Sequence, residues 1–279
     1  MQPNTLISTS ELASILGNEN LVILDSRFYL TDLAKGHQEY LAGHIPGAIF
    51  IDLHHELAGE ETQTSGRHPL PSVDDFAQCI QQWGVGLDSD VIVYDDMGGA
   101  MAARAWWMLT QQGIKTRVLN GGYPAWKREG RDIDTLVPDV TPNTVSLKVE
   151  FPWSVSEQQV VENFETNQFQ LVDSRAQDRF LGENETMDPV AGHIPGAINR
   201  PFMDNLDEKG RFKPAEQLHV EWQDWIMHPV DDYVYYCGSG VTACHNILAL
   251  NYAGIDARLL YVGSWSQWSK RMSRLMQGN

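Results

Sequence analysis

Basic side chains are scarce in this 279-residue sequence. Lys and Arg number 20 against 37 Asp and Glu, and the formal net charge is -17. Because the chain contains no basic run, the composition argues against a nucleic-acid partner, whose phosphates need such cations. An anionic substrate must be attracted by local groups, since the overall field of the protein repels it.

Long apolar runs and frequent cysteines are also missing. No stretch approaches the roughly 20 apolar residues that span a bilayer, and the N-terminal residues lack a basic segment followed by an apolar one. Three cysteines without framework spacing suit a reducing compartment, so we expect a cytoplasmic protein without a membrane partner. The nine histidines and three cysteines show no zinc spacing, and we expect neither a metal nor another cofactor.

Two parts of the chain repeat one another. Ala42–Ile49 is identical to Ala191–Ile198, and Leu24–Arg27 similarly matches Val172–Arg175. A repeat this long indicates a duplicated domain, because solenoid repeats have periods of about 20 to 50 residues. Leu136–Val155 contains three prolines and little helical periodicity, which is typical of a linker. We therefore predict two domains, residues 1–145 and 146–279.

Short apolar runs alternate with helix-like segments in the first copy. They lie at Leu21–Leu24, Tyr40–Leu41, Ala48–Ile51, Val73–Trp83, Val91–Tyr94, Ala102–Gln111 and Arg117–Leu119. This alternation predicts an α/β fold in which each domain has a mainly parallel sheet flanked by helices. Ligands of such sheets bind near the carboxyl ends of the strands.

One strand end carries a potential nucleophile. The β-rich run Tyr233–Tyr236 stops at Cys237, a glycine-punctuated loop follows, and a helix is predicted from about Thr242. Gly238 and Gly240 let the backbone curl so that successive amide hydrogens converge on the sulfur. A helix N-terminus also favours the thiolate of a cysteine, whose ordinary pKa is about 8.5.

The residue type alone leaves a packing role for Cys237 open, because free cysteines are often buried. The glycine loop favours the nucleophile. The first copy carries Asp95 at the equivalent strand end, so only the second domain is expected to perform thiol chemistry. Cys79 and Cys244 are expected to have structural roles.

Three features of the sequence together resemble the tandem-domain rhodaneses. They are the paired Gly-His-Ile-Pro-Gly-Ala blocks, the Arg104–Met108 segment and the Cys237 loop. This sulfurtransferase family includes thiosulfate sulfurtransferase and 3-mercaptopyruvate sulfurtransferase. The resemblance covers nearly the whole chain. It implies two rhodanese-like domains, the second with an active cysteine that carries a persulfide during turnover.

The loop residues also distinguish members of that family. Cys237, Gly238, Ser239, Gly240, Val241 and Thr242 are similar to the mercaptopyruvate type, whereas the thiosulfate type has a basic pair in place of Gly238 and Ser239. The resemblance implies that sulfur passes from 3-mercaptopyruvate to Cys237, where the amides of the loop hold the persulfide. The acceptor is expected to be cyanide, a small thiol or a thioredoxin-like protein.

The resemblance suggests further site residues. Arg179 matches an arginine that holds the substrate carboxylate, but the second arginine of many mercaptopyruvate enzymes is missing, because residues 185–188 read Glu-Thr-Met-Asp. Arg200 is a candidate substitute in the cleft. His68 lies where the family brings a histidine of the first domain to the cleft as a proton relay, and His54 replaces its carboxylate partner.

Other residues have two interpretations or a structural one. Ser239 either polarises the donor carbonyl or shapes the turn. Arg104 is expected to tie Trp106, Trp107 and neighbouring acids into the packing between the domains. Residues present in both copies are expected to serve the fold, namely His44, His193, Asp25 and Asp173.

Three other functions remain in view. A thiosulfate:cyanide sulfurtransferase is the first, and a persulfide carrier or regulatory binding module without turnover is the second. A phosphatase is the third, but phosphate-binding cysteine loops have an arginine six positions after the cysteine, and here Ala243 stands there.

Overall fold

The structure is a computed structural model that describes residues 5–144, 148–226 and 233–276. In the first half of the chain, strands alternate with helices in the order β1 (Leu6–Ile7), α1 (Thr9–Ile15), β2 (Leu21–Asp25), α2 (Lys35–Ala42), β3 (Ala48–Phe50), α3 (Val73–Gln82), β4 (Asp90–Tyr94), α4 (Ala102–Thr110), β5 (Lys115–Leu119) and α5 (Gly122–Arg128). The predicted alternation is confirmed. The sequence-based prediction missed β1 and α1.

The second half repeats this order. It contains β6 (Ser154–Val155), α6 (Glu157–Thr166), β7 (Gln170–Asp173), α7 (Gln177–Leu181), β8 (Ile198–Asn199), the 3-10 helix η1 (Phe202–Asn205), α8 (Ala215–Trp225), β9 (Tyr233–Tyr236), α9 (Ala243–Tyr252), β10 (Leu260–Tyr261) and α10 (Ser264–Met276). The predicted linker therefore ends in a strand, β6. The predicted boundary at residue 145 lies outside the described residues.

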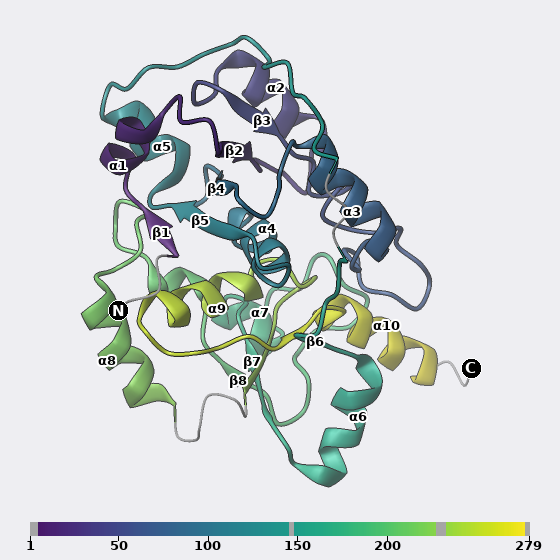
Figure 1. The fold of residues 1–279 in the computed structure, drawn as a ribbon. Coiled ribbons are helices and arrows are strands. Elements are labelled where there is room, and N and C mark those ends of the chain that lie inside the picture. The colour runs from purple at the N-terminus through teal and green to yellow at the C-terminus, as the bar shows by residue number, and fades with distance from the viewer. Residues whose placement is uncertain (1–4, 145–147, 227–232, 277–279) are drawn as a thin grey trace.

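Each half forms a five-stranded sheet. The strand orders are β1-β5-β4-β2-β3 and β6-β10-β9-β7-β8, and all the strand pairs are parallel. Helices cover both sheets (Figure 1). The α/β fold with two similar domains is confirmed. The order places β4 and β9 inside their sheets, so the loops that follow these strands leave the middle of the carboxyl edge.

Alternation along the central strands divides the core. Ile92 and Tyr94 of β4 pack with residues of α1 and α5, whereas Val91 and Val93 face the opposite side. This second side joins one apolar core that continues into the other domain. There α4 packs against α9, and Trp107 donates a hydrogen bond to the Arg258 carbonyl at 2.8 Å. The domains thus share a core, and Figure 1 shows α4 and α9 near the boundary between them.

The duplicated sequence blocks have duplicated contacts. Arg27 and Arg175 each bind the aspartate two residues earlier, with Nη2–Oδ2 distances of 2.6 Å. The same guanidinium groups donate to the carbonyls of Gly43 and Gly192, the glycines of the repeated blocks. These ion pairs are almost completely buried, so the repeated Asp-Ser-Arg and Gly-His-Ile-Pro segments serve the fold.

The histidines of the repeated blocks are held locally. His44 Nδ1 lies 2.8 Å from the Tyr40 carbonyl, and His193 Nδ1 lies 2.8 Å from the Phe180 carbonyl. Neither histidine lines the cavity described below. Their geometry agrees with the predicted role in the fold.

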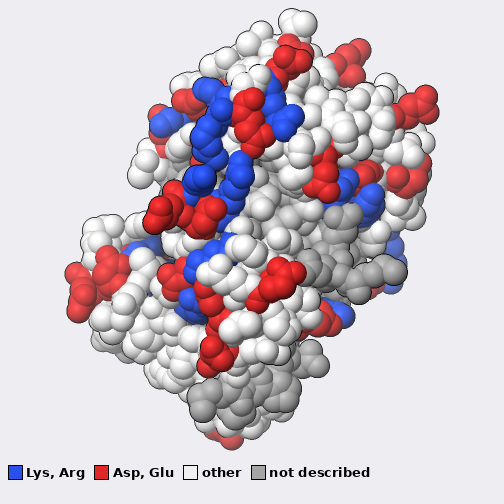
Figure 2. All heavy atoms as spheres, turned by 90° about the vertical axis from the view of Figure 1, so that its left-hand side faces the viewer, with Lys and Arg blue, Asp and Glu red and all other residues white. Residues whose placement is uncertain are grey.

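Acidic and basic side chains lie next to one another on the face that Figure 2 shows. Ion pairs join such side chains in the described structure, where Asp90 pairs with both Lys115 and Arg117, at 2.8 and 2.6 Å. Among the described residues, no helix combines the length and the apolar character that a membrane span requires.

The Asp25–Arg27 pair generates a stability prediction. Asp25→Asn leaves a buried guanidinium without its counter-ion, and removal of one partner of a buried pair typically costs about 3 to 5 kcal/mol. We expect a loss of this size in the free energy of unfolding, measured by urea denaturation. The exposed Asp32→Asn should change it by less than about 0.5 kcal/mol. Equal values for the two variants would contradict the prediction.

Candidate active site

Cys237 follows the last residue of β9 and is anchored through its backbone. Its N–H donates to Ser264 Oγ at 3.1 Å, and its carbonyl accepts from Trp265 N at 3.0 Å. Both contacts come from the start of α10. The strand and this helix together fix where the side chain begins.

A cavity of about 520 Å³ lies over Cys237. The cysteine is only 2% exposed, but it lines this cavity. Most of the lining is apolar and comes from both domains: Phe28, Leu30, Met97, Met101, Met187 and Phe202. The sulfur is therefore covered by the protein while facing a space large enough for a small substrate.

The loop after Cys237 has the backbone geometry that the glycines predict. Gly240 has a φ of 77°, and a Cβ added there would lie 2.4 Å from the Val262 carbonyl oxygen, so only glycine fits. In the described part of the chain, the N–H groups of residues 238–242 donate to no protein acceptor. α9 begins directly after this loop, so an anion in the loop also lies at a helix N-terminus.

The first domain shows what such a loop binds. There the Asp95 carboxylate accepts four backbone N–H groups: Oδ1 from Met97 and Gly99, Oδ2 from Met101 and Ala102, at 2.7 to 2.9 Å. Asp95 and Cys237 occupy equivalent positions at the ends of β4 and β9.

The backbone of the two loops also agrees. Gly98 in the first loop has a φ of 68°, close to that of Gly240. The Asp95 carbonyl accepts from Tyr123 N, as the Cys237 carbonyl does from Trp265 N. One loop is thus permanently filled by a carboxylate, and the other presents its amides to the side chain of Cys237.

His68 lies in the site as the sequence predicts. Its Nδ1 is 2.8 Å from Ser239 Oγ, in the Cys237 loop. Burial, with the nearby positive charges of Arg104 and Arg67, lowers the pKa of His68 to about 3. The imidazole is therefore neutral at ordinary pH. Its ring meets that of His54 edge-on at 6.0 Å, and in the described chain no carboxylate bonds to it.

Arg179 also lines the cavity. Its Nη2 is bound by both oxygens of Glu185, at 2.9 Å each, and lies 3.4 Å from Asp188. Burial alone would raise the pKa of Glu185, but hydrogen bonds from Met187 N and Arg179 lower it, so this carboxylate is charged. The segment without the expected second arginine thus supplies acids that bind Arg179.

Arg67 is a residue of the site that the sequence pattern does not predict. This residue lines the cavity and forms an ion pair with Asp188 of the other domain. Its backbone N–H donates to Ser266 Oγ at 3.1 Å, across 199 residues of sequence. Its position directly before His68 is the one signal that the sequence offered.

Arg104 connects the two domains, but its partners differ from the prediction. It is completely buried, and it donates to the carbonyls of Gly240, Leu57 and His68 at 2.9 to 3.3 Å instead of binding acids. These carbonyl oxygens accept from both NH₂ groups of Arg104 without neutralising its charge, and its buried Nε has no partner in the described chain. A positive charge therefore lies behind the Cys237 loop.

The structure does not support Arg200 as a cleft residue. Its guanidinium pairs with Asp204 at 3.0 Å and Glu221 at 3.3 Å, lies over the Trp222 ring, and is not part of the cavity lining. These nearby acids and the aromatic ring explain its position.

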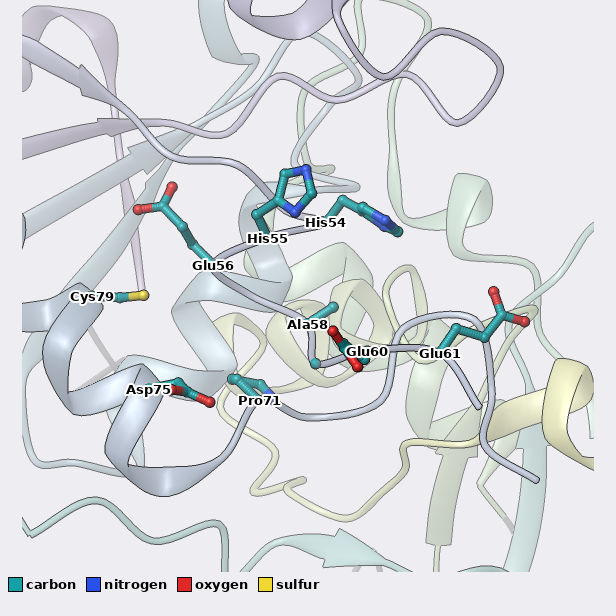
Figure 3. A pocket seen from close by; sticks show the side chains of 10 residues that line it. His54, His55, Glu56, Ala58, Glu60, Glu61, Pro71, Asp75 and Cys79 are labelled. Atoms are coloured by element: carbon teal, nitrogen blue, oxygen red, sulfur yellow. The ribbon is translucent and has the colours of Figure 1, made fainter. Parts of the chain in front are cut away.

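The other two cysteines differ from Cys237. Cys244 is fully buried, its Sγ lies 3.6 Å from the Gly240 carbonyl, and burial raises its pKa to about 12. Cys79 is half-buried and packs against the edge of the core; Figure 3 shows it beside a second cavity near Glu56 and Asp75. Burial and these acids raise the pKa of Cys79 to about 11.

The neutral state of His68 predicts a pH effect on stability. In the unfolded chain the histidine gains a proton near pH 6.5, whereas the folded chain resists protonation down to about pH 3. Neutral His68 therefore contributes fully to the free energy of unfolding above pH 6.5. This contribution falls by on the order of 2 kcal/mol between pH 7 and 5. In His68→Gln, urea denaturation at the two pH values should show a loss smaller by this amount. The exposed His55→Gln should behave like the wild type, and equal losses in all three proteins would contradict the prediction.

The chain is similar to curated sequences over almost its full length. It is 43% identical over 272 residues to a probable 3-mercaptopyruvate sulfurtransferase of Pseudomonas aeruginosa, with 96% of each chain covered. It is 39% identical over 274 residues to a putative thiosulfate sulfurtransferase of Mycobacterium tuberculosis, which covers 96% of this chain and 95% of the relative.

Solved structures agree with these relatives. The 3-mercaptopyruvate sulfurtransferase from Leishmania major superposes with a TM-score of 0.89 at 29% identity, over 98% of this chain and 76% of that one. A 3-mercaptopyruvate sulfurtransferase from Escherichia coli gives 0.80 at 30% identity, over 94% and 98%. Residues 8–129 and 156–271 each match the rhodanese-like domain, and the chain belongs to the rhodanese family.

Proposed function

We propose that this protein is a sulfurtransferase that moves sulfur from 3-mercaptopyruvate to a thiol or cyanide through a persulfide on Cys237. The observation that carries the proposal is the pair of equivalent loops. The loop of the first domain binds the Asp95 carboxylate with four amides, and the loop of the second presents unused amides beside a cysteine in a cavity. A persulfide anion on Cys237 extends one atom beyond the sulfur, as a carboxylate oxygen extends beyond its carbon.

In the first half-reaction, the Cys237 thiolate attacks the sulfur of 3-mercaptopyruvate. An S–S bond forms and the C–S bond of the donor breaks, and its electron pair leaves with pyruvate as the enolate. The enolate takes a proton and becomes pyruvate. The amides of residues 238–242 stabilise the negative charge on the persulfide that remains.

Neutral His68 and Ser239 act on the donor carbonyl in this proposal. His68 Nδ1 fixes the Ser239 hydroxyl at 2.8 Å within the cavity lining. A hydroxyl held there hydrogen-bonds the ketone oxygen, where negative charge develops as the enolate forms. A neutral imidazole suits this positioning role, whereas a pKa of about 3 does not suit the proton relay that the family resemblance implies.

In the second half-reaction, an acceptor attacks the outer sulfur of the persulfide. A thiol takes that sulfur as its own persulfide, cyanide takes it as thiocyanate, and the Cys237 thiolate is released. A small thiol, cyanide or a thioredoxin-like protein suits this step. The cytoplasmic location remains part of the proposal, and the three free cysteines agree with a reducing compartment.

Thiosulfate is the alternative donor, and several similar sequences, the one from Mycobacterium tuberculosis among them, are named for that activity. The loop of this chain has no cation of its own, because Gly238 and Ser239 follow the cysteine. A compact dianion gains most from such cations, whereas 3-mercaptopyruvate carries a single charge on a carboxylate away from its sulfur.

A persulfide carrier without turnover is the other alternative. It would release a single stoichiometric burst of pyruvate, whereas an enzyme releases pyruvate continuously.

The nucleophile is tested by single substitutions of the cysteines. Cys237→Ser should abolish transfer and the mass increase of one sulfur atom that follows donor treatment, both read by intact-protein mass spectrometry and pyruvate release. Cys79→Ser and Cys244→Ser are matched controls that should keep both. A persulfide on Cys79 or Cys244 of the wild type would refute the assignment.

The donor is tested by comparing kcat/KM for 3-mercaptopyruvate and thiosulfate with one common acceptor. The wild type should prefer 3-mercaptopyruvate by at least about tenfold, the factor that 1.4 kcal/mol of transition-state binding provides. A preference for thiosulfate would overturn the donor assignment and leave the persulfide chemistry in place.

A further inference from the structure

A third cavity lies between the two domains, at the end of α4 and α9 that is remote from Cys237. Its volume is about 500 Å³, and no described residue lines both this cavity and the one over Cys237. The two helices pack against each other (Figure 1). Met101 and Thr242, just before the helices, line the Cys237 cavity, whereas Thr110 and Asn251, near their ends, line the third. About nine residues of helix, roughly 13 Å, therefore separate the two cavities.

Hydrogen bonds between the domains hold the walls of the third cavity in place. Trp107 Nε1 donates to the Arg258 carbonyl at 2.8 Å, and Trp153 N donates to Gln111 Oε1 at 3.1 Å. The Trp153 carbonyl accepts from Leu260 N at 3.0 Å. Trp153 and Arg258 line the cavity, and the guanidinium carbon of Arg258 lies 5.5 Å from the centroid of the Trp153 ring. Aromatic rings and guanidinium groups both stack on flat molecules.

Two buried polar groups in the lining have no partner. Trp106 is 4% exposed and Thr5 is 7% exposed, and both line the cavity. In the described chain, neither Trp106 Nε1 nor Thr5 Oγ1 forms a hydrogen bond. Other polar side chains of the lining are satisfied, since Thr110 Oγ1 donates to the Trp106 carbonyl and Asn251 Nδ2 donates to the Ala257 carbonyl. Buried polar groups are almost always paired, so these two favour a ligand with a polar atom.

The charged side chains of the lining are already paired. Lys115 Nζ lies 2.8 Å from Asp90 Oδ2, and Arg258 pairs with Asp256. These pairs leave little net charge to attract an ion. The cavity therefore favours a neutral molecule with a flat ring, in agreement with the aromatic lining and its position between two domains.

We propose that the third cavity is a binding site for a small, neutral aromatic molecule that carries a hydroxyl group, as a phenol does. An indole N–H can only donate, whereas the hydroxyl of Thr5 donates or accepts. A phenolic oxygen accepts from Trp106 Nε1, its proton is available to Thr5 Oγ1, and the ring lies against Trp153. The inference goes beyond the proposed function and does not depend on it, because the Cys237 cavity has a separate lining.

Two matched probes test this site, because 4-fluorophenol and fluorobenzene differ only in the hydroxyl group. We expect 4-fluorophenol to shift the Trp106 indole resonance in ¹H–¹⁵N spectra, a resonance that is missing in Trp106→Phe. In ¹⁹F NMR titrations, fluorobenzene should bind at least about tenfold more weakly, because it leaves both polar groups unpaired. A Trp106 resonance that millimolar 4-fluorophenol does not shift, or equal affinities for the two probes, would refute the site. Water alone would then be the partner of these groups.

Single substitutions in the lining locate the bound hydroxyl. Trp106→Phe keeps an aromatic ring without its N–H, and Thr5→Val keeps the side-chain shape without its hydroxyl. Each should weaken 4-fluorophenol binding about tenfold and leave fluorobenzene binding unchanged. Trp268→Phe is the matched control, because Trp268 Nε1 is also buried without a partner in the described chain but lies outside this cavity, and it should bind like the wild type. Wild-type affinity for 4-fluorophenol in folded Trp106→Phe, or in Thr5→Val, would contradict the inference.

Discussion

The site depends on a backbone that turns several N–H groups toward one point. Such a turn needs a left-handed glycine, and Gly98 and Gly240 supply it after the central strands of the two sheets. Unpaired amides in a buried position are costly unless an anion accepts from them. The loop after each central strand therefore favours a negatively charged group. The residue at the end of the strand determines which group this is.

The two domains place different groups in this loop. Asp95 fills its loop with its own side chain, which accepts four backbone N–H groups. Cys237 leaves room for an exchangeable charge, which suits a sulfur that arrives and departs. The first domain still contributes to the second site, since His68 contacts Ser239 and Arg104 contacts the Gly240 carbonyl. The core shared by α4 and α9 packs the two domains together and so holds these contacts in place.

The features that could be predicted are local in sequence. The run that ends at Cys237, its glycines and the following helix lie within a few turns of chain, and periodicity places them correctly. Arg67 could not be predicted, because its backbone is fixed by Ser266, 199 residues away. The place of Arg200 outside the cavity lining could not be predicted for the same reason. Tertiary packing brings its guanidinium to Asp204, Glu221 and the Trp222 ring. Local pattern thus predicts the strand, the loop and the helix around Cys237, and tertiary contacts decide which cations lie near them.

The small exposure of Cys237 has a consequence for the delivery of sulfur. Bulky oxidants are kept away from the sulfur while it waits for an acceptor, because apolar side chains of both domains surround the opening. An acceptor reaches this sulfur through the cavity that the two domains line, so its attacking atom must fit among these apolar side chains before any chemistry occurs.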